Sequence, residues 1–424
     1  MSMRETINTQ MFGQRPVGID LFAGAGGLSL GFEQAGFDIA AAVDVDPIHC
    51  AVHEYNFPLT RSICADVANL RGEDIRSRAK LGGIDIGIVF GGAPCQGFSM
   101  IGKRALDDPR NGLVAHFVRL VLELSPKYCL FENVKGLTIG KHAVILTEMI
   151  ETLQKGGYDV LLPYQVLNAA NYGVPQDRRR LFLIAARSGA SLPRYPVPSF
   201  ENVTVWDALE DLPDADTFEE LKTLDSIPVE WMTRSPYARK LRGLDVDIKN
   251  FSYGRAFDHN CLTSSMRTEH TELSKARFEA TISGKTEPVS RFRKLAFDGL
   301  CNTLRAGTDS ARGAFTSPRP IHPTFSRVVT VREAARLHSY PDWFRFHVTK
   351  WHGFRQIGNS VPPFLGRAVA AQIIEAIGII PIKPERILDL RDETLLSFDM
   401  SAAAKYFGVA ANVVPQRKRK LQKD

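Results

Sequence analysis

Long apolar runs are missing from this sequence of 424 residues. No stretch approaches the about 20 apolar residues that a membrane-spanning helix requires. The amino end, MSMRETINTQMFGQRP, also lacks the apolar centre of a secretory leader. We therefore expect no membrane anchor and a cytoplasmic location.

Cysteine clusters are missing as well. The six cysteines form neither a CxxC pair nor a Cys/His cluster with zinc spacing. This pattern argues against a disulfide framework and predicts no bound metal. Isolated thiols of this kind are most often small core residues. The six are Cys50, Cys64, Cys95, Cys129, Cys261 and Cys301.

Net charge is small, at +6, but unevenly distributed. Residues 231–330 hold 17 Lys and Arg against 9 Asp and Glu, whereas residues 201–230 hold 10 acidic residues and one Lys. A basic block in a near-neutral chain indicates a polyanionic partner, although a solvated basic surface has the same composition. Residues 416–424 add a short basic tail suited to phosphate contacts.

The first half of the chain alternates strand-like and helix-like stretches. Apolar runs at 16–22, 38–46, 84–90, 128–134 and 179–186 predict strands, with a further helix and strand between 145 and 167. This alternation predicts an α/β fold with a doubly wound, Rossmann-like parallel sheet. From the proline-rich SLPRYPVPSF (191–200) to about 330 the periodicity is irregular, which predicts a smaller inserted domain before helices return.

A glycine turn follows the first predicted strand. In DLFAGAGG, Gly24, Gly26 and Gly27 lie between a strand and a helix, where the backbone can approach a nucleotide-like ligand. Asp44 lies 20 residues after Gly24, at the end of the second strand, where a carboxylate can accept ribose hydroxyls. The pair favours an adenosine-containing cofactor. A packing turn or a dinucleotide site remains open, although GAGG is not GxGxxG.

Two chemically active residues follow neighbouring predicted strands. Cys95, in GGAPCQGFS, and Glu132, in FENV, are both expected at the carboxyl end of the sheet, where ligands bind. A thiol and a partly desolvated carboxyl there form a plausible nucleophile and proton donor. A structural cysteine and a helix-capping glutamate are the simpler alternatives.

A basic run, QDRRR, precedes the strand at 181–186. Arg178 and Arg180 alternate along an extended chain and should point the same way. They would bind a carbonyl oxygen or a phosphate, or else form a basic strand edge.

Taken together, six ordered segments resemble the DNA (cytosine-5)-methyltransferase family, in its bacterial or phage modification type. The segments are DLFAGAGG, GGAPCQGFS, FENVKG, NYGVPQDRRRLFLIAAR, RVVTVREAARLHSYPDWF and QIGNSVPP. The resemblance covers roughly residues 16–190 and 325–378, and the basic insertion falls where that family carries its target recognition domain.

The resemblance implies sequence-specific transfer of a methyl group from S-adenosylmethionine to C5 of a flipped-out cytosine in double-stranded DNA, leaving S-adenosylhomocysteine. Cys95 would add to C6, Glu132 would act at N3, and Arg178 and Arg180 would contact the base and order the catalytic loop. Asp44 stands where the family commonly has Glu, so its reach to the ribose is shorter.

The resemblance also implies the binding residues. The cofactor site would consist of Phe22, Ala23, Gly24, Gly26, Leu28, Asp44, Val45, Asp66, Val67, Pro94, Leu113, Asn359, Ser360 and Val361. DNA contacts would come from Gln96, Ser99, Asn133 and Val134. From the charge of the basic insertion, rather than from the resemblance, we add Arg293, Arg305 and Arg312; Arg305 and Arg312 flank a glycine-containing, turn-like stretch suited to a close approach to the groove.

The implied organisation has four parts: a catalytic domain at 1–190, a target recognition domain at 191–326, a return to the catalytic domain at 327–380 and a C-terminal extension with the basic tail at 381–424. We expect a monomer, associated with the bacterial nucleoid and serving a restriction–modification system with an endonuclease for the same site. The alternatives are an RNA (tRNA) cytosine-5 methyltransferase and a non-catalytic DNA-binding regulator.

Overall fold

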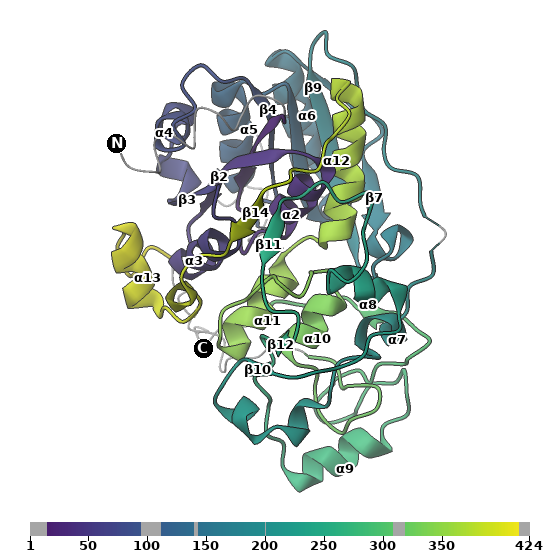
Figure 1. Ribbon diagram of the computed structural model, residues 1–424. Coiled ribbons are helices and arrows are strands. Elements are labelled where there is room, and N and C mark those ends of the chain that lie inside the picture. The colour runs from purple at the N-terminus through teal and green to yellow at the C-terminus, as the bar shows by residue number, and fades with distance from the viewer. Residues whose placement is uncertain (1–14, 95–111, 140–142, 200, 308–318, 415–424) are drawn as a thin grey trace, which may run out of the picture.

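The computed structural model describes residues 15–94, 112–139, 143–199, 201–307 and 319–414 (Figure 1). Within these residues, an eight-stranded sheet has the order β3-β2-β1-β4-β5-β9-β6, and β7 also pairs with β9. Its strands are β1 (Val17–Leu21), β2 (Asp38–Asp44), β3 (Arg61–Cys64), β4 (Ile86–Gly91), β5 (Tyr128–Val134), β6 (Tyr158–Val160), β7 (Gln165–Asn168) and β9 (Arg179–Arg187).

The predicted Rossmann-like fold is confirmed, with two differences. The strand β3 was not predicted, because its four residues carry too short an apolar pattern. The strand β9 runs antiparallel to β5, β6 and β7, whereas the pairs among β1, β2, β3, β4 and β5 are all parallel. The short segment 169–178 between β7 and β9 holds no crossover helix, so the chain returns antiparallel.

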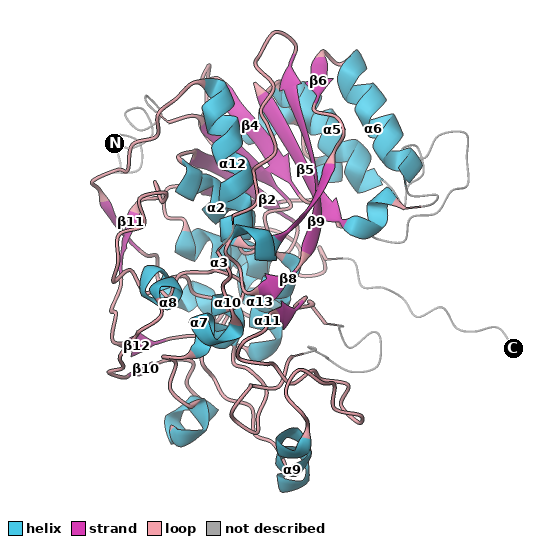
Figure 2. Ribbon diagram, turned by 90° about the vertical axis from the view of Figure 1, so that its right-hand side faces the viewer, coloured by secondary structure: helices cyan, strands magenta, loops and turns pink. Residues whose placement is uncertain are grey.

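Helices cover both faces of the sheet (Figure 2). One apolar core packs α2 (Gly27–Ala35) and α12 (Pro363–Ile377) against one face. A second core packs α4 (Gly72–Arg78), α5 (Gly112–Leu124) and α6 (Ala143–Lys155) against the other. Helix α3 (Pro47–Asn56) follows β2. The late helix α12 therefore completes a layer begun near the amino end.

The insertion lies at one end of the sheet (Figure 1). It contains α7 (Val205–Leu209), β10 (Ile227–Pro228), α8 (Pro236–Leu241), β11 (Gly254–Ala256), β12 (Cys261–Leu262), α9 (Glu272–Ala280) and β13 (Cys301–Asn302). Its buried residues from Val205 to Leu262 join the core of α2 and α12, and so do Leu295, Cys301 and Leu304 near its end. A small separate cluster around α9 contains Phe278, Ile321 and Val328, with Phe292 packed against it.

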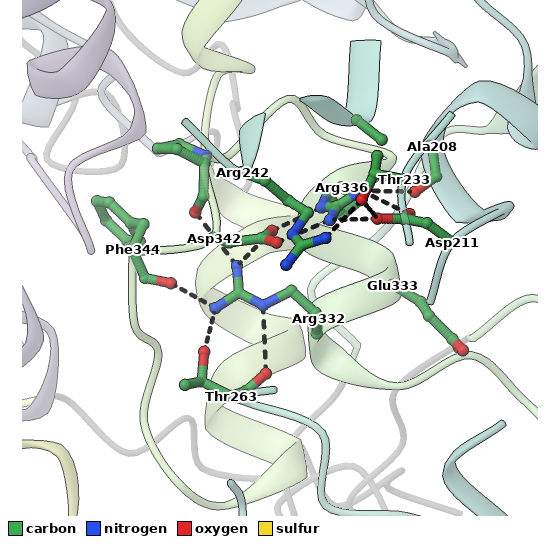
Figure 3. Close-up of polar contacts among 12 residues, drawn as sticks. Ala208, Asp211, Thr233, Arg242, Thr263, Arg332, Glu333, Arg336, Asp342 and Phe344 are labelled. Carbon is green, nitrogen blue, oxygen red and sulfur yellow. Dashed lines mark hydrogen bonds and ion pairs between the residues drawn. The ribbon is translucent and has the colours of Figure 1, made fainter. Parts of the chain in front are cut away.

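Helix α10 (Val331–Arg336) holds the insertion through buried ion pairs (Figure 3). Arg336, which is fully buried, pairs with Asp211 at 3.1 Å and with Asp342 at 2.7 Å. Arg332 donates to the hydroxyl of Thr263 at 2.6 Å. One helix therefore fixes two separate stretches of the insertion against the segment around Asp342.

The C-terminal extension returns to the core. It contains β14 (Ile387–Asp389), a short 3₁₀ helix (Glu393–Leu396) and α13 (Met400–Phe407). Before the extension, α11 (Lys350–Asn359) leads to α12. Strand β14 pairs in parallel with β11 of the insertion. The 3₁₀ helix and α13 pack on α3. Among the described residues, no helix is both long enough and apolar enough to span a bilayer.

Candidate active site

The predicted cofactor residues converge at the carboxyl ends of β1 and β2. Strand β1 ends at Leu21 and α2 begins at Gly27, so the glycine loop occupies 22–26. The backbone N–H of Gly24 donates to Asp44 Oδ2 at 2.8 Å, and the N–H of Asp46 donates to Oδ1 at 2.8 Å. These two bonds fix the Asp44 carboxylate beside the loop.

The backbone of the glycine loop faces open space at Gly24. A Cβ built on Gly24, whose φ is 56°, meets no other atom within 4 Å. Phe22 and Asp44 are half-buried at the edge of this space. Donors and a carboxylate around an open backbone turn fit the ribose and amino-acid ends of S-adenosylmethionine.

Residues from distant parts of the sequence complete this edge. Asp66 follows β3 and its carboxylate accepts the N–H of Ala68 at 2.9 Å, while Val45 and Val67 follow β2 and β3. Leu113 lies in the first turn of α5. Asn359 ends α11 and is exposed.

The segment 360–361 packs directly on the start of α2. A Cβ on Gly27 would lie 2.6 Å from the Val361 carbonyl oxygen and 2.8 Å from the Ser360 Cβ. The glycine loop and Asn359–Val361 are therefore neighbours, although more than 300 residues separate them in the sequence.

A buried charge cluster beneath Asp44 was not predicted. His49 Nδ1 lies 3.6 Å from Asp44 Oδ1, and its Nε2 lies 3.9 Å from Asp46 Oδ2. Arg355 of α11 pairs with the same Asp46 oxygen at 2.8 Å. Burial opposes a charge on His49, but Asp46 and Asp44 outweigh it and raise its pKa. The spacing of Asp46 and His49, one helical turn apart, was the available signal.

Glu132 lies at the end of β5 with only 8% of its surface exposed. Its Oε1 pairs with Arg180 Nε at 3.0 Å, and a Cβ on Gly92 would lie 2.4 Å from its Oε2. Burial raises the pKa of Glu132, and Arg180 and Arg178 oppose that rise. The carboxyl therefore binds a proton more readily than an ordinary glutamate does.

Arg178 has a different role from the one predicted. Its side chain is fully buried and donates to the carbonyls of Leu304 at 2.8 Å, Gly358 at 2.8 Å and Ser360 at 2.7 Å. This arrangement corrects the expectation that Arg178 contacts the target base, because long-range backbone carbonyls already bind its guanidinium. Arg180 is the arginine of this motif that meets Glu132.

The segment that leads from β4 to Cys95 is described as far as Pro94. Pro94 is exposed, and Asn133 Nδ2 donates to the Ala93 carbonyl at 2.9 Å, which ties this segment to the end of β5. Val134 is 41% exposed. Cys95, Gln96, Ser99 and Arg312 lie outside the described residues.

The arginines of the basic insertion fall into two groups. Arg293 and Arg305 are exposed, as DNA contacts require. Arg255 instead forms a buried two-bond ion pair with Glu33 of α2, with both N–O distances at 2.9 Å. Arg267 donates to Glu219 at 2.7 Å. Part of the positive charge in this block therefore holds the fold together.

Comparison with known proteins identifies the family. The family described as C-5 cytosine-specific DNA methylase matches residues 17–375. The type II methyltransferase M.XorII of Xanthomonas oryzae pv. oryzae is 61% identical over 409 residues, covering 96% of each chain. M.AgeI of Thalassovita gelatinovora is 32% identical, covering 85% of this chain and 99% of its own.

Solved structures share the fold. A DNA modification methyltransferase encoded within an E. coli prophage superposes with a TM-score of 0.71 at 34% identity, covering 86% of this chain and 99% of its own. The Dnmt2 methyltransferase of S. pombe has the same fold, with a TM-score of 0.54 at 18% identity and coverage of 86% and 100%. The chain therefore belongs to the C-5 cytosine-specific DNA methylases and is a bacterial DNA cytosine-5-methyltransferase of the type II restriction–modification kind.

Proposed function

We propose that this enzyme methylates C5 of a flipped-out cytosine at a specific site in double-stranded DNA, with S-adenosylmethionine as the donor. The observation that carries the proposal is the buried Glu132–Arg180 pair, which lies against Gly92, three residues before Cys95. The pair supports the proposal because a carboxyl that can give a proton and a cation lie beside the segment that leads to Cys95.

The glycine loop and its neighbours would hold the cofactor. Asp44, fixed by two backbone N–H groups, accepts the ribose hydroxyls, and Asp66 accepts the adenine amino group. The other positions are Phe22, Ala23, Gly24, Gly26, Leu28, Val45, Val67, Pro94, Leu113, Asn359, Ser360 and Val361. When bound, S-adenosylmethionine supplies an electrophilic methyl group to the activated C5. The product is S-adenosylhomocysteine, and no metal takes part.

The residues of this chain activate the cytosine ring. The Cys95 thiolate adds to C6, which makes C5 nucleophilic. Glu132 shares its proton with N3 while the addition takes place, and Arg180 stabilises the charge that develops at O2. After the C5 proton is lost, elimination breaks the C6–S bond and restores Cys95. Asn133 and Val134 flank the base.

Recognition of the DNA site belongs to the insertion, with the boundaries 191–326 as its limits. Flipping a base costs a few kcal/mol, which contacts to the DNA backbone offset. Arg293, Arg305 and Arg312 contribute to these contacts, and Gln96 and Ser99 approach the target. The enzyme acts as a cytoplasmic monomer at the nucleoid, and an endonuclease for the same site is its functional partner.

Covalent trapping tests this function. A 5-fluorocytosine duplex carrying the recognised site, incubated with S-adenosylmethionine, should give a denaturation-resistant complex with the wild type and none with Cys95→Ala. Sequencing of 5-methylcytosine in host DNA identifies the site. An adduct on another cysteine would refute the assigned nucleophile. Preferential methylation of tRNA over duplex DNA would favour an RNA methyltransferase.

A further inference from the structure

The end of the insertion is hydrogen-bonded to the segment that contains Arg178 and Arg180. Strand β13 pairs in parallel with β8 (Gln176–Asp177), which lies just before β9. Thr303 Oγ1 donates to the Asp177 carbonyl at 2.6 Å. Residues 301–304 are therefore held against the chain segment that continues to Arg180.

Leu304 is held at both of its backbone polar groups. Its N–H donates to Gln176 Oε1 at 3.2 Å, and its carbonyl accepts from Arg178 Nη1 at 2.8 Å. Gln176 and Arg178 are both fully buried. A shift of Leu304 would break bonds that buried groups cannot replace with water.

The same two side chains reach Ser360 by separate routes. Arg178 Nη2 donates to the Ser360 carbonyl at 2.7 Å. Gln176 Nε2 donates to His338 Nδ1 at 3.0 Å, and His338 Nε2 lies 3.2 Å from the same carbonyl. We call this closed set of contacts among Gln176, Arg178, Leu304, His338 and Ser360 the Leu304 ring.

The protonation state of His338 fits this ring. Burial, with Arg178 adding to its effect, lowers the pKa of His338 well below its usual value, so the imidazole is neutral. Since Nδ1 accepts from the Gln176 amide, the proton lies on Nε2, which donates to Ser360. Every member of the ring therefore has a matched donor or acceptor.

Functional segments flank the ring on each side. Asn359 and Ser360 belong to the proposed cofactor edge, by which we mean the glycine loop (22–26), Asp44 and the segment 359–361. Arg305 directly follows Leu304. The two segments are in contact, because a Cβ on Gly358 would lie 2.3 Å from the Ala306 nitrogen. A movement of one segment must therefore displace the other or break the ring.

We propose that the Leu304 ring positions the cofactor edge and the end of the insertion as one unit, so that cofactor binding and duplex DNA binding strengthen each other. The inference rests on the proposed function, because it takes S-adenosylmethionine and DNA as the two ligands. Gln176, Arg178 and His338 are then positioning residues. By linkage, the effect is reciprocal.

Binding linkage tests the proposal. The probe is an unmethylated duplex that contains the site recognised by the enzyme. Its Kd is measured by fluorescence anisotropy with and without saturating S-adenosylhomocysteine. We expect the wild type to bind DNA at least about 5-fold more tightly with the cofactor product. Arg178→Lys and His338→Leu should bring this ratio to within about 2-fold of one, because each breaks the ring.

Arg242→Lys is the matched control. Arg242 is also buried, and it donates to the Trp231 carbonyl at 3.0 Å and the His259 carbonyl at 2.9 Å, outside the ring. The Arg242→Lys variant should lower the melting temperature as Arg178→Lys does. It should nevertheless keep the wild-type ratio of the DNA Kd values without and with S-adenosylhomocysteine. Should Arg178→Lys not fold, His338→Gln, which keeps a donor toward Ser360 but loses the acceptor for Gln176, takes its place.

Two outcomes would overturn the proposed role of the Leu304 ring. One is a wild-type Kd ratio near one, and the other is a folded ring variant that keeps the wild-type Kd ratio. Failure of the proposed function looks different. In that case the wild type transfers no methyl group to any duplex, whatever the linkage shows.

Discussion

At the scale of single residues, the environment of Glu132 combines a buried carboxyl with a cation. Burial favours the protonated acid, whereas Arg180 at 3.0 Å favours the carboxylate, and the net direction of the pKa is upward. Such opposition suits the proposed role of a group that gives a proton to N3 and takes it back, because burial stabilises the acid and Arg180 stabilises the carboxylate.

Glu132→Gln should therefore lose turnover much more than DNA affinity. Loss of one group that stabilises the transition state commonly costs about 2.7–4 kcal/mol, or about 10²–10³-fold in rate. Single-turnover methyl transfer and DNA binding measure the two effects. Glu123→Gln is the control, since Glu123 also pairs with an arginine, Arg119, at 2.7 Å but on α5. Transfer by Glu132→Gln within a few-fold of wild type would reject the role.

Asp20 is a second buried carboxyl, at the end of β1. It accepts a hydrogen bond from Ser29 Oγ at 2.6 Å, and burial raises its pKa to about 8. Since the unfolded chain releases this proton near pH 4 and the folded chain near pH 8, stability falls as pH rises through this window.

Asp20→Asn should remove this dependence, because asparagine keeps an acceptor for Ser29 and carries no proton to lose. Melting temperatures at pH 5 and pH 8.5 provide the measurement. We expect the variant to gain on the wild type as pH rises, by about 2–4 °C for each kcal/mol removed. Parallel pH profiles for the two proteins would contradict a buried, protonated Asp20.

At the scale of elements, the C-terminal extension packs against the glycine loop and α3. Leu396 is fully buried in a cluster with Ala25 of the glycine loop and Val52 of α3. The Val348 N–H donates to the Leu396 carbonyl at 3.0 Å. The extension therefore supports the loop and the helix that follow β1 and β2, although the family match ends at residue 375.

Leu396→Ala should weaken cofactor binding although Leu396 is not among the proposed cofactor contacts. A buried Leu→Ala change costs about 2–5 kcal/mol of stability and leaves a cavity beside Ala25. We expect S-adenosylhomocysteine affinity, measured by calorimetry, to fall about 10-fold, equivalent to about 1.4 kcal/mol.

Leu388→Ala is the matched control for this change. Leu388 is also buried in the extension, but it lies beside Asp38 and Thr60, at the amino ends of β2 and β3. It should lose stability and keep the cofactor affinity. Equal losses of affinity in both variants would mean that the effect is general destabilisation.

At the scale of the whole molecule, the insertion has two parts with different attachments. Residues 205–262 share the main core with Leu295, Cys301 and Leu304, and they are fixed by Arg255 and by the ion pairs of α10. The part around α9 has its own small cluster. Because the second part is less bound to the catalytic core, we expect it to carry the choice of DNA site.

Exchange of residues 268–294 for the matching segment of a relative with a different site should therefore change the methylated sequence. The core contacts of 205–262 and of Leu295, Cys301 and Leu304 stay in place, so the hybrid should fold and keep its catalytic groups. Sequencing of 5-methylcytosine in host DNA gives the result. A hybrid that methylates the original site would place recognition elsewhere in the chain.

Local sequence was sufficient for much of the fold. The strands at β1, β2, β4, β5 and β9 follow from apolar runs, and the glycine loop follows from the residues between a strand and a helix. The juxtaposition of Asp44 with Gly24 and the position of Glu132 at a strand end were also predictable, because strand ends in such a sheet share one edge.

The tertiary structure alone decided which partners the charged side chains have. Arg178, Arg180 and Arg255 look alike in sequence, yet one binds three backbone carbonyls, one meets Glu132 and one pairs with Glu33. A guanidinium donates to any nearby oxygen, so its role depends on which distant segment lies beside it. The sequence determined which chemical groups this protein has, and the long-range packing of α10, α11 and the extension decided which of them face the reaction.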